Sequence, residues 1–346
     1  MYRPKILSIG NAVVDVIGSV PESMLGPNGL LKGSMTLVSE AESHRRQTML
    51  LPSSIVKAPG GSAANTAACL ASLNAKSTFI GKLGRDELGN YFSEALATDG
   101  VQFDTPATDR AVTGHCIAMI TPDGERTMST HLGACQLLGP EDINPAVLGE
   151  FQLIYLEGYL FDSPLSSNAV RHAVEHAKRQ GLKIAVSLSD RLCVQRNRDD
   201  FADLFHRKSL DIVLGNELEM KEFLGADSLE TYSGPLPSKL VMTLGARGAA
   251  VLDPLSGYTE CAARPVRQIV DLVGAGDSFA AGFLYGYASG LADHRCLEIG
   301  GLCASELVQS RGPRPRQKLS GLLGLLRMHP FHMTQEGAVL ASKCQI

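Results

Sequence analysis

The sequence has 346 residues, of which 44% are hydrophobic and 20% charged, and its formal net charge is -4. This composition allows one large α/β domain with an appendage, while the negative charge and the lack of an apolar run of about 18 residues argue against nucleic acid and membrane as partners. Eight cysteines without a C-x-x-C pair, and an N-terminus without the apolar core of a signal peptide, indicate reduced thiols and a cytoplasmic location.

The first third of the chain combines short β-rich runs with two helices. Pro21 ends the second β-rich run, and a mixed segment follows it. Gly60 and Gly61 then precede a strong helix-forming run, for which Ser62 is the expected N-cap. A Pro-Asp-Gly turn predicts a β-hairpin at 112–131. The other strands expected here are 5–9, 13–20 and 78–81, and the second helix is expected at 86–98.

From residue 151 onwards strands and helices alternate. The expected strands are 151–156, 183–188, 211–214 and 239–243, and the expected helices are 166–180, 201–206, 217–224 and one that follows Asp277. This order predicts a mainly parallel sheet with helices on both faces. The early β-rich pieces, within 12–57 and 111–131, are interpreted as a small separate β unit. The tail 321–346 carries no clear signal.

The strongest chemical motif is Asp-Leu-Val-Gly-Ala-Gly-Asp at 271–277, followed by a helix rich in small residues. Gly274, Ala275 and Gly276 stand just before the helix, where outward-pointing amides and the helix dipole favour an anion. A carboxylate at Asp277 would repel phosphate unless it accepts the proton of an attacking hydroxyl, as in-line phosphoryl transfer requires. The alternative interpretation is an ordinary glycine turn with an aspartate N-cap.

An earlier pair of glycines offers a second ligand-binding turn. Gly60 and Gly61 allow close approach of a ligand, and Asn65 lies one helical turn further on, within reach of a ligand hydroxyl. The chain contains neither the Walker phosphate-binding pattern nor the dinucleotide pattern G-x-G-x-x-G. A hydride-transfer enzyme therefore loses its main support.

Two weaker motifs follow in the second half. Asn216 and Glu219 share one face of a helix, which suits the holding of Mg²⁺ through water, or alternatively makes a helix capping box. Thr243, Gly245 and Gly248 form a strand end and a glycine turn that could meet phosphate or ribose. Taken alone, that segment is only a turn between two elements.

In order and spacing these four motifs resemble the ribokinase-like (PfkB) carbohydrate kinase family, over about residues 4–320. The segments similar to its adenosine kinase branch are 10–15, 125–134, 157–160, 188–190 and 310–315. The resemblance implies a three-layer α/β/α ribokinase-like fold with a mainly parallel central sheet and a small β-sheet lid. It assigns 1–11, 58–110 and 132–320 to the large domain, and 111–131 with part of 12–57 to the lid.

The resemblance also implies the roles of single residues. Asp277 is the catalytic base, the amides of Gly274, Ala275 and Gly276 form the anion hole, and Arg126 reaches the phosphate or substrate region from the lid, which closes over the substrate. The remaining roles are substrate binding by Asn11, Asp15, Gly60, Gly61, Asn65 and Tyr159, nucleotide binding by Asn216, Thr243, Gly245, Gly248 and Asp271, and water-mediated Mg²⁺ binding by Asn216 and Glu219. The basic cluster 311–316 is interpreted as a structural or nucleotide-side loop.

The leading hypothesis is an ATP- and Mg²⁺-dependent kinase that converts adenosine to AMP, as a monomer or homodimer. A kinase of the same family acting on ribose or fructose is the alternative, and a non-catalytic nucleotide-binding protein is the third. Leu272 is the only support for the third hypothesis, because the family usually has threonine there. The same leucine weakens the expectation of a monovalent cation.

Overall fold

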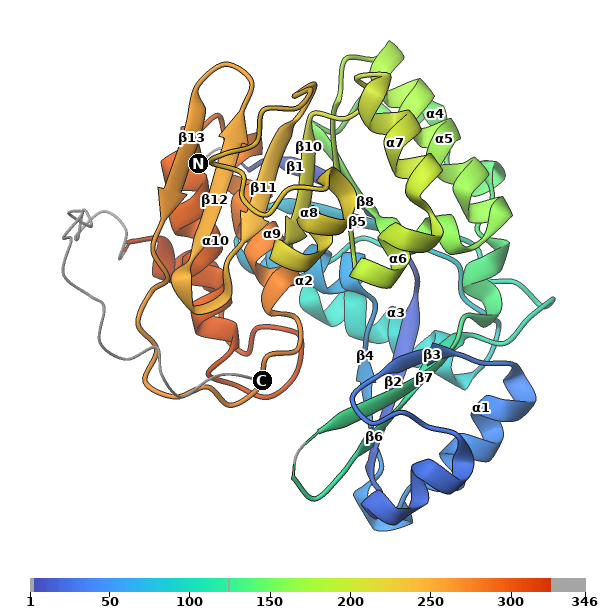
Figure 1. Ribbon diagram of the computed structural model, residues 1–346. Helices are drawn as coiled ribbons and strands as arrows, with labels where there is room; N and C mark the ends of the chain where they lie inside the picture. The colour runs from blue at the N-terminus through green and yellow to red at the C-terminus, as the bar shows by residue number, and fades with distance from the viewer. Residues whose placement is uncertain (1–2, 124, 325–346) are drawn as a thin grey trace.

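The computed structural model describes residues 3–123 and 125–324, and an eight-stranded sheet forms the centre of this part (Figure 1). The strand order is β13-β12-β11-β10-β9-β8-β1-β5. The bounds are β1 (Lys5–Ile9), β5 (Lys76–Ile80), β8 (Leu153–Glu157), β9 (Lys183–Ser187), β10 (Ile212–Asn216), β11 (Lys239–Thr243), β12 (Ala249–Asp253) and β13 (Gly257–Cys261). In the order from β11 to β5 all neighbouring strands are parallel, while β12 pairs antiparallel with both β11 and β13. The predicted mainly parallel sheet is confirmed.

A second sheet of five strands in the described part of the chain has the order β3-β7-β6-β2-β4 and extends away from the large sheet, with α1 (Glu40–Gln47) against it (Figure 1). Its strands are β2 (Val13–Ser19), β3 (Met35–Leu37), β4 (Val56–Pro59), β6 (Gly114–Ile120) and β7 (Arg126–His131). β6 and β7 pair antiparallel, from His115 opposite His131 to Ile120 opposite Arg126, which confirms the predicted hairpin. β2 follows β1 after three residues, so the two sheets are joined directly beside the end of a central strand.

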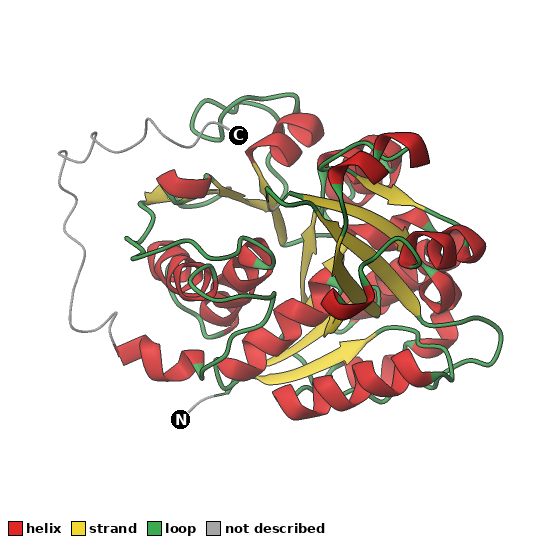
Figure 2. Cartoon of the chain, turned by 90° about the horizontal axis from the view of Figure 1, so that it is seen from below, coloured by secondary structure: helices red, strands yellow, loops and turns green. Residues whose placement is uncertain are grey.

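Helices cover both faces of the large sheet (Figure 2). On one face lie α2 (Ser62–Ser72), α3 (Glu87–Asp99), α9 (Ala275–Ala288) and α10 (Asp293–Leu307), and on the other lie α4 (Pro145–Leu148), α5 (Pro164–Arg179), α6 (Arg191–Arg196), α7 (Arg198–His206) and α8 (Glu217–Leu224). Short 3₁₀ helices are Glu22–Met24, Gly26–Asn28, Pro52–Ser54, Gly133–Leu137, Pro140–Asp142, Gly158–Asp162, Gly245–Arg247 and Leu319–Gly324. The layers agree with the three-layer α/β/α fold expected from the resemblance. Within the described residues no helix has the length and apolar character needed to cross a bilayer.

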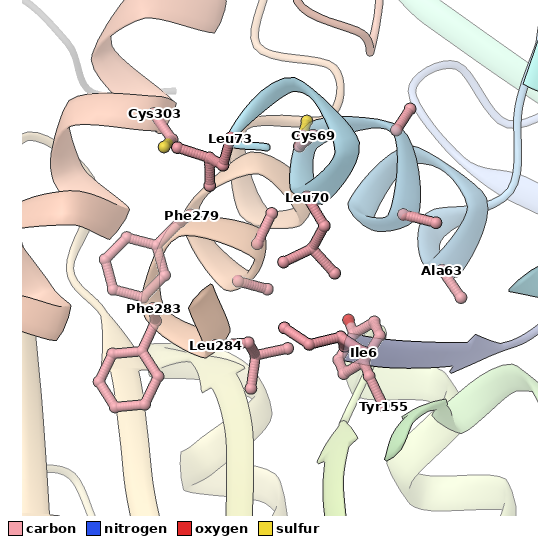
Figure 3. Packing of buried hydrophobic residues seen from close by; sticks show 14 of the residues in the cluster. Ile6, Ala63, Cys69, Leu70, Leu73, Tyr155, Phe279, Phe283, Leu284 and Cys303 are labelled. Carbon is pink, nitrogen blue, oxygen red and sulfur yellow. The ribbon is translucent and has the colours of Figure 1, made fainter. Parts of the chain in front are cut away.

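Close packing between α2, α9 and α10 determines where the two glycine turns meet. Phe279 and Phe283 of α9 are buried beside Leu70 of α2, above the sheet (Figure 3). A Cβ on Gly282 would lie only 2.6 Å from the carbonyl oxygen of Ile299, so α10 approaches the backbone of α9 directly. The starts of α2 and α9 are thereby brought together at the carboxyl ends of the strands.

The expectation that Ser62 caps α2 is wrong. The N-cap is Gly61 at φ +84, and Ser62 is the first residue of the helix. A side chain at Gly61 would place its Cβ 2.2 Å from the carbonyl oxygen of Asn11, so only glycine fits this turn. The strands β12 and β13 and the helices α1 and α10 were not predicted from the sequence. Of the tail, only 321–324 is described, within a 3₁₀ helix; the rest of the predicted tail lies outside the described residues.

Candidate active site

A cavity of about 110 Å³ opens at the carboxyl ends of the parallel strands, where ligands bind in sheets of this kind. Its polar lining joins the start of α2, the ends of β10 and β11 and the start of α9. The predicted site residues that line it are Asn216, Thr243, Glu219, Gly276 and Asp277. A larger hollow of about 470 Å³ lies at the amino ends of the strands, away from every predicted site residue.

The start of α9 has the features of an anion site. Gly274 is its N-cap in the left-handed conformation, at φ +78. Within the described residues the backbone amides of Gly276 and Asp277 have no hydrogen-bond partner, and a Cβ on Gly276 would meet no atom within 4 Å. Two free amides at the positive end of a helix dipole can receive a phosphate oxygen.

Asp277 is held directly at this helix start by two donors from α2. Its Oδ1 accepts a hydrogen bond from Ser62 Oγ at 2.5 Å, and its Oδ2 accepts one from Asn65 Nδ2 at 3.0 Å. Burial raises the pKa of the Asp277 carboxyl, while these two hydrogen bonds and the charge of Arg314 lower it. The arrangement places a carboxylate able to accept a proton next to two free amides.

Glu157, at the end of β8, is a site residue to which the sequence reading gave no role. Its Oε2 accepts from the Ala63 amide at 2.9 Å, and its Oε1 accepts from Asn11 Nδ2 at 3.1 Å. The side chain is buried, which raises the pKa of its carboxyl to about 7. Glu157 thus joins the predicted residue Asn11 to the first turn of α2. The signal available in the sequence was a charged residue directly after the predicted strand 151–156.

Asp15 on β2 faces the other predicted glycine turn. A Cβ on Gly60 would lie 2.9 Å from the Asp15 carboxylate oxygens, so the carboxylate occupies the space that a side chain at position 60 would need. Burial raises the pKa of Asp15 to about 6, against the lowering effect of Arg126 and Arg314. Asp15, Gly60 and Gly61 therefore lie together at the junction of the two sheets.

Asn216 and Glu219 form a helix capping box, the alternative interpretation of this motif. Asn216 Oδ1 accepts from the Glu219 amide and Glu219 Oε2 accepts from the Asn216 amide, both at 3.0 Å. Both residues nevertheless line the cavity with Asp277. Burial raises the pKa of Glu219 to about 7, and the charges of Asp190 and Asp277 add to the effect. A carboxylate and an amide at the cavity wall suit a cation that keeps its own water ligands, as Mg²⁺ does.

Arg126 connects the small sheet to the loop that precedes α9. Its Nη2 lies 2.9 Å from Asp271 Oδ2. Asp271 also accepts hydrogen bonds from the amides of Val273 at 3.1 Å and Gly312 at 3.0 Å. In this structure the guanidinium of Arg126 is thus paired with a carboxylate of the predicted nucleotide site.

Tyr159, Gly245 and Gly248 are among the predicted residues that do not line the cavity. Tyr159 donates from its hydroxyl to Asp190 at 2.6 Å and packs against the core on the other face of the sheet. Gly245 and Gly248 lie in the turn between β11 and β12, which is the simple turn that the sequence reading weighed. A Cβ on Gly248 would lie 2.1 Å from the Cys261 carbonyl oxygen, so strand packing explains this glycine.

Together the doubly covered sheet, the free amides and the carboxylate at one helix start define a phosphotransferase site of the ribokinase-like type. The model of the pfkB family of carbohydrate kinases matches residues 29–318, and the chain belongs to this family. Its members transfer phosphate to hydroxyl groups of sugars or nucleosides, so the chain is a phosphotransferase with an alcohol acceptor.

Relatives with different substrates resemble the chain to a similar degree. A solved adenosine kinase from Sinorhizobium meliloti is 35% identical with a TM-score of 0.85, and covers 94% of this chain and 99% of its own. A solved probable sugar kinase from Rhizobium etli CFN 42 is 33% identical, also with a TM-score of 0.85, and covers 95% and 100%. Ribokinase from Arabidopsis thaliana is 28% identical over 74% of this chain and 68% of its own length.

Proposed function

We propose that the protein transfers the γ-phosphate of ATP to the primary 5'-hydroxyl of a nucleoside, with adenosine as substrate and AMP as product. The observation that carries the proposal is Asp277, whose carboxylate is held by Ser62 and Asn65 beside the two free amides at the start of α9. A base and an anion site in contact are the parts that in-line phosphoryl transfer needs.

In this mechanism the acceptor hydroxyl lies between Asp277 and the γ-phosphate. Asp277 accepts its proton as the oxygen attacks phosphorus, while the bond from the γ-phosphorus to the bridging oxygen breaks and ADP leaves with that electron pair. The amides of Gly276 and Asp277 hold the negative charge that develops on the phosphoryl oxygens. Mg²⁺, held through water near Asn216 and Glu219, would neutralise charge on the phosphates. The carboxylate of Asp15 and the side-chain amide of Asn11 would orient the hydroxyls of a ribose-type ring.

The choice of a nucleoside rests on the adenosine kinases among the relatives. Adenosine kinase from Dictyostelium discoideum is 26% identical over 342 residues, which are 90% of this chain and 96% of its own length. The adenosine kinase from Sinorhizobium meliloti matches over a similar span. A substrate that presents a ribose ring also agrees with Asn11, Asp15 and Asn65 converging near Asp277.

A sugar kinase is the second candidate function. It is favoured by the probable sugar kinase from Rhizobium etli, which matches this chain as fully as the adenosine kinase does, and by the position of Tyr159. This tyrosine was predicted to bind the substrate, where its ring could form an aromatic wall for a nucleoside base, but its hydroxyl is bonded to Asp190 and its ring packs against the core. A sugar would not need such a wall.

A substrate panel separates the two candidates. Purified protein is supplied with MgATP and either adenosine, ribose or fructose, and the release of ADP is measured. We expect turnover of adenosine with none of ribose or fructose. The reverse result would replace the proposed substrate with a sugar and leave the chemistry at Asp277 in place. Repeating the panel with K⁺ present or absent tests whether Leu272 has removed cation activation.

We also propose a division into a large domain and a lid that closes on substrate, with monomer or homodimer as the working form in the cytoplasm. The support is the direct passage from β1 to β2 and the ion pairs Arg126–Asp271 and Lys57–Glu87, which join the small sheet to the large domain across the junction. Closure would exclude water from the transferred phosphoryl group. Comparing X-ray scattering of the protein alone and with adenosine tests the motion.

A further inference from the structure

Arg314 is a buried cation next to the proposed base. Its side chain is only 9% exposed, and its Nη1 lies 2.6 Å from Oδ2 of Asp99, the last residue of α3. Its Nε donates to Asn65 Oδ1 in a long hydrogen bond of 3.4 Å. Within the described residues its Nη2 is buried without any partner. Burying a guanidinium costs solvation free energy, and an unpaired donor adds to that cost. The position of Arg314 therefore needs an explanation other than packing.

The contact with Asn65 determines how that amide is oriented. A guanidinium can only donate hydrogen bonds, so the oxygen of Asn65 must face Arg314. The amide nitrogen is then left to face Asp277, to which it donates at 3.0 Å. A flipped amide would set NH₂ against a guanidinium and an oxygen against a carboxylate. Asp99, Arg314, Asn65 and Asp277 thus form one directed chain of contacts.

The charges around Asp277 show why a cation is needed. The titratable groups that interact with it are the carboxyls of Asp15 on β2, Glu157 on β8 and Glu219 on α8, together with Tyr155 on β8 and Cys69 on α2, whose pKa values burial raises so that both keep their protons. Each of them would repel an ionised Asp277 when it loses its own proton. Burial also raises the pKa of Asp277, while the hydrogen bonds from Ser62 and Asn65 and, after them, the charge of Arg314 lower it.

We propose that Arg314 is a positioning residue for the base: it fixes the amide of Asn65 and places a positive charge beside it, so that the carboxylate of Asp277 is held in place to accept the proton of the acceptor hydroxyl. The inference rests on the proposed function. It gives a role to the basic cluster 311–316, which the sequence reading interpreted as a structural or nucleotide-side loop.

A purely structural role is the competing explanation. Arg314 lies 6.0 Å from the ring centroid of Phe92 on α3, and with Asp99 it could simply join its loop to that helix. Loss of such a contact would lower the thermal stability of the protein. It would not change the pH at which the base titrates.

The test compares Arg314→Gln with Arg316→Gln, a control in the same loop at an exposed position. The pH profile of kcat/KM is measured for each, and the titration of Asp277 is followed independently by carboxyl ¹³C NMR, with Asp277→Asn used to assign the signal. For R314Q we expect the acidic limb and the NMR titration to move up by roughly one pH unit, which is about tenfold in kcat/KM on the acidic side. R316Q is expected to match wild type.

Arg314→Lys completes the test, because it keeps the charge but not the fork of donors. Its acidic limb should stay at the wild-type pH, while kcat falls about tenfold because Asn65 loses its fixed orientation. The proposal would be overturned if, in R314Q, the acidic limb of the kcat/KM profile and the NMR titration of Asp277 stayed at the wild-type pH and only the melting temperature fell. If R314Q does not fold, a wild-type kcat in R314K would overturn it. Should wild type itself lack kinase turnover, the proposed function fails, and the NMR titration still decides the role of Arg314.

Discussion

The helices α2 and α9 start side by side from glycine turns, yet the two turns are used in opposite ways. At α2 the protein satisfies its own groups: the Ala63 amide donates to Glu157 at 2.9 Å, and Gly61 is pressed against the Asn11 carbonyl. At α9 the amides of Gly276 and Asp277 remain free within the described residues, and nothing stands where a side chain of Gly276 would be.

The difference shows that a glycine turn before a helix does not by itself identify a ligand site. Both turns have a glycine at positive φ and both precede helices rich in small residues. What distinguishes them is whether a buried carboxylate of the protein already occupies the helix start. The closed turn, residues 60–61 before α2, positions Asn65 and Ser62. The open turn, residues 274–276 before α9, is left for a ligand.

The largest expected effect is that of replacing Asp277, the proposed base at the open turn. In Asp277→Asn we expect kcat to fall by about 10²–10⁴-fold, because the amide cannot accept the proton, while binding of MgATP is retained. Turnover is measured by ADP release and binding by calorimetry. Asp109→Asn, at a side chain that is 74% exposed, serves as control. Wild-type turnover in D277N would contradict the assignment of the base.

A methyl group at the closed turn should damage the fold. Gly61→Ala forces a side chain into φ +84 and places its Cβ 2.2 Å from a backbone oxygen. We expect a loss of about 3 kcal/mol in the free energy of unfolding, from backbone strain and overpacking together. Urea denaturation measures it. A variant as stable as wild type would mean that the turn is not closed in solution.

Glu157 allows the closed turn to be tested by pH. Its pKa is about 7 in the folded protein against 4.5 for an ordinary glutamate, so its contribution to stability is full below about pH 4.5 and is lost as the pH rises through 7. Relative to wild type, Glu157→Gln should therefore gain about 2–3 kcal/mol in unfolding free energy between pH 5 and pH 8.

The control for this pH effect is Glu150→Gln, at a side chain that is 65% exposed. Its difference from wild type should not change between the two pH values. Urea denaturation at both pH values gives all the free energies needed. A difference between wild type and E157Q that stays constant would show that Glu157 is ionised in the folded protein throughout this range.

The smallest expected effect is that of a methyl group at the open turn. Gly276→Ala should fold with the stability of wild type, because its Cβ meets no atom within 4 Å. The methyl group would narrow the space next to the free amides, so we expect kcat/KM for ATP to fall about tenfold. Steady-state kinetics and thermal melting measure the two quantities. A lowered melting temperature with unchanged kinetics would show the two turns to be alike.

Much of this arrangement could be predicted from local patterns. The strand and helix order from 151 to 243 and the hairpin at 112–131 follow from apolar periodicity and turn residues, and the structure has them with shifts of a few residues at the ends. The antiparallel strands β12 and β13 were missed, because short runs between glycines carry little signal beyond that of a turn. Ser62 was misjudged because its hydroxyl bonds to a residue 215 positions away.

The sequence by itself determined the fold class and the glycine-rich helix start with Asp277, since both depend on residue types at short, regular spacings. Only the tertiary structure decided which helix start is open and which residues hold the base. Glu157 and Arg314 matter because they are buried beside charges that come from distant parts of the chain. Burial and the partners of a charge depend on packing between elements, and no local pattern of residues records them.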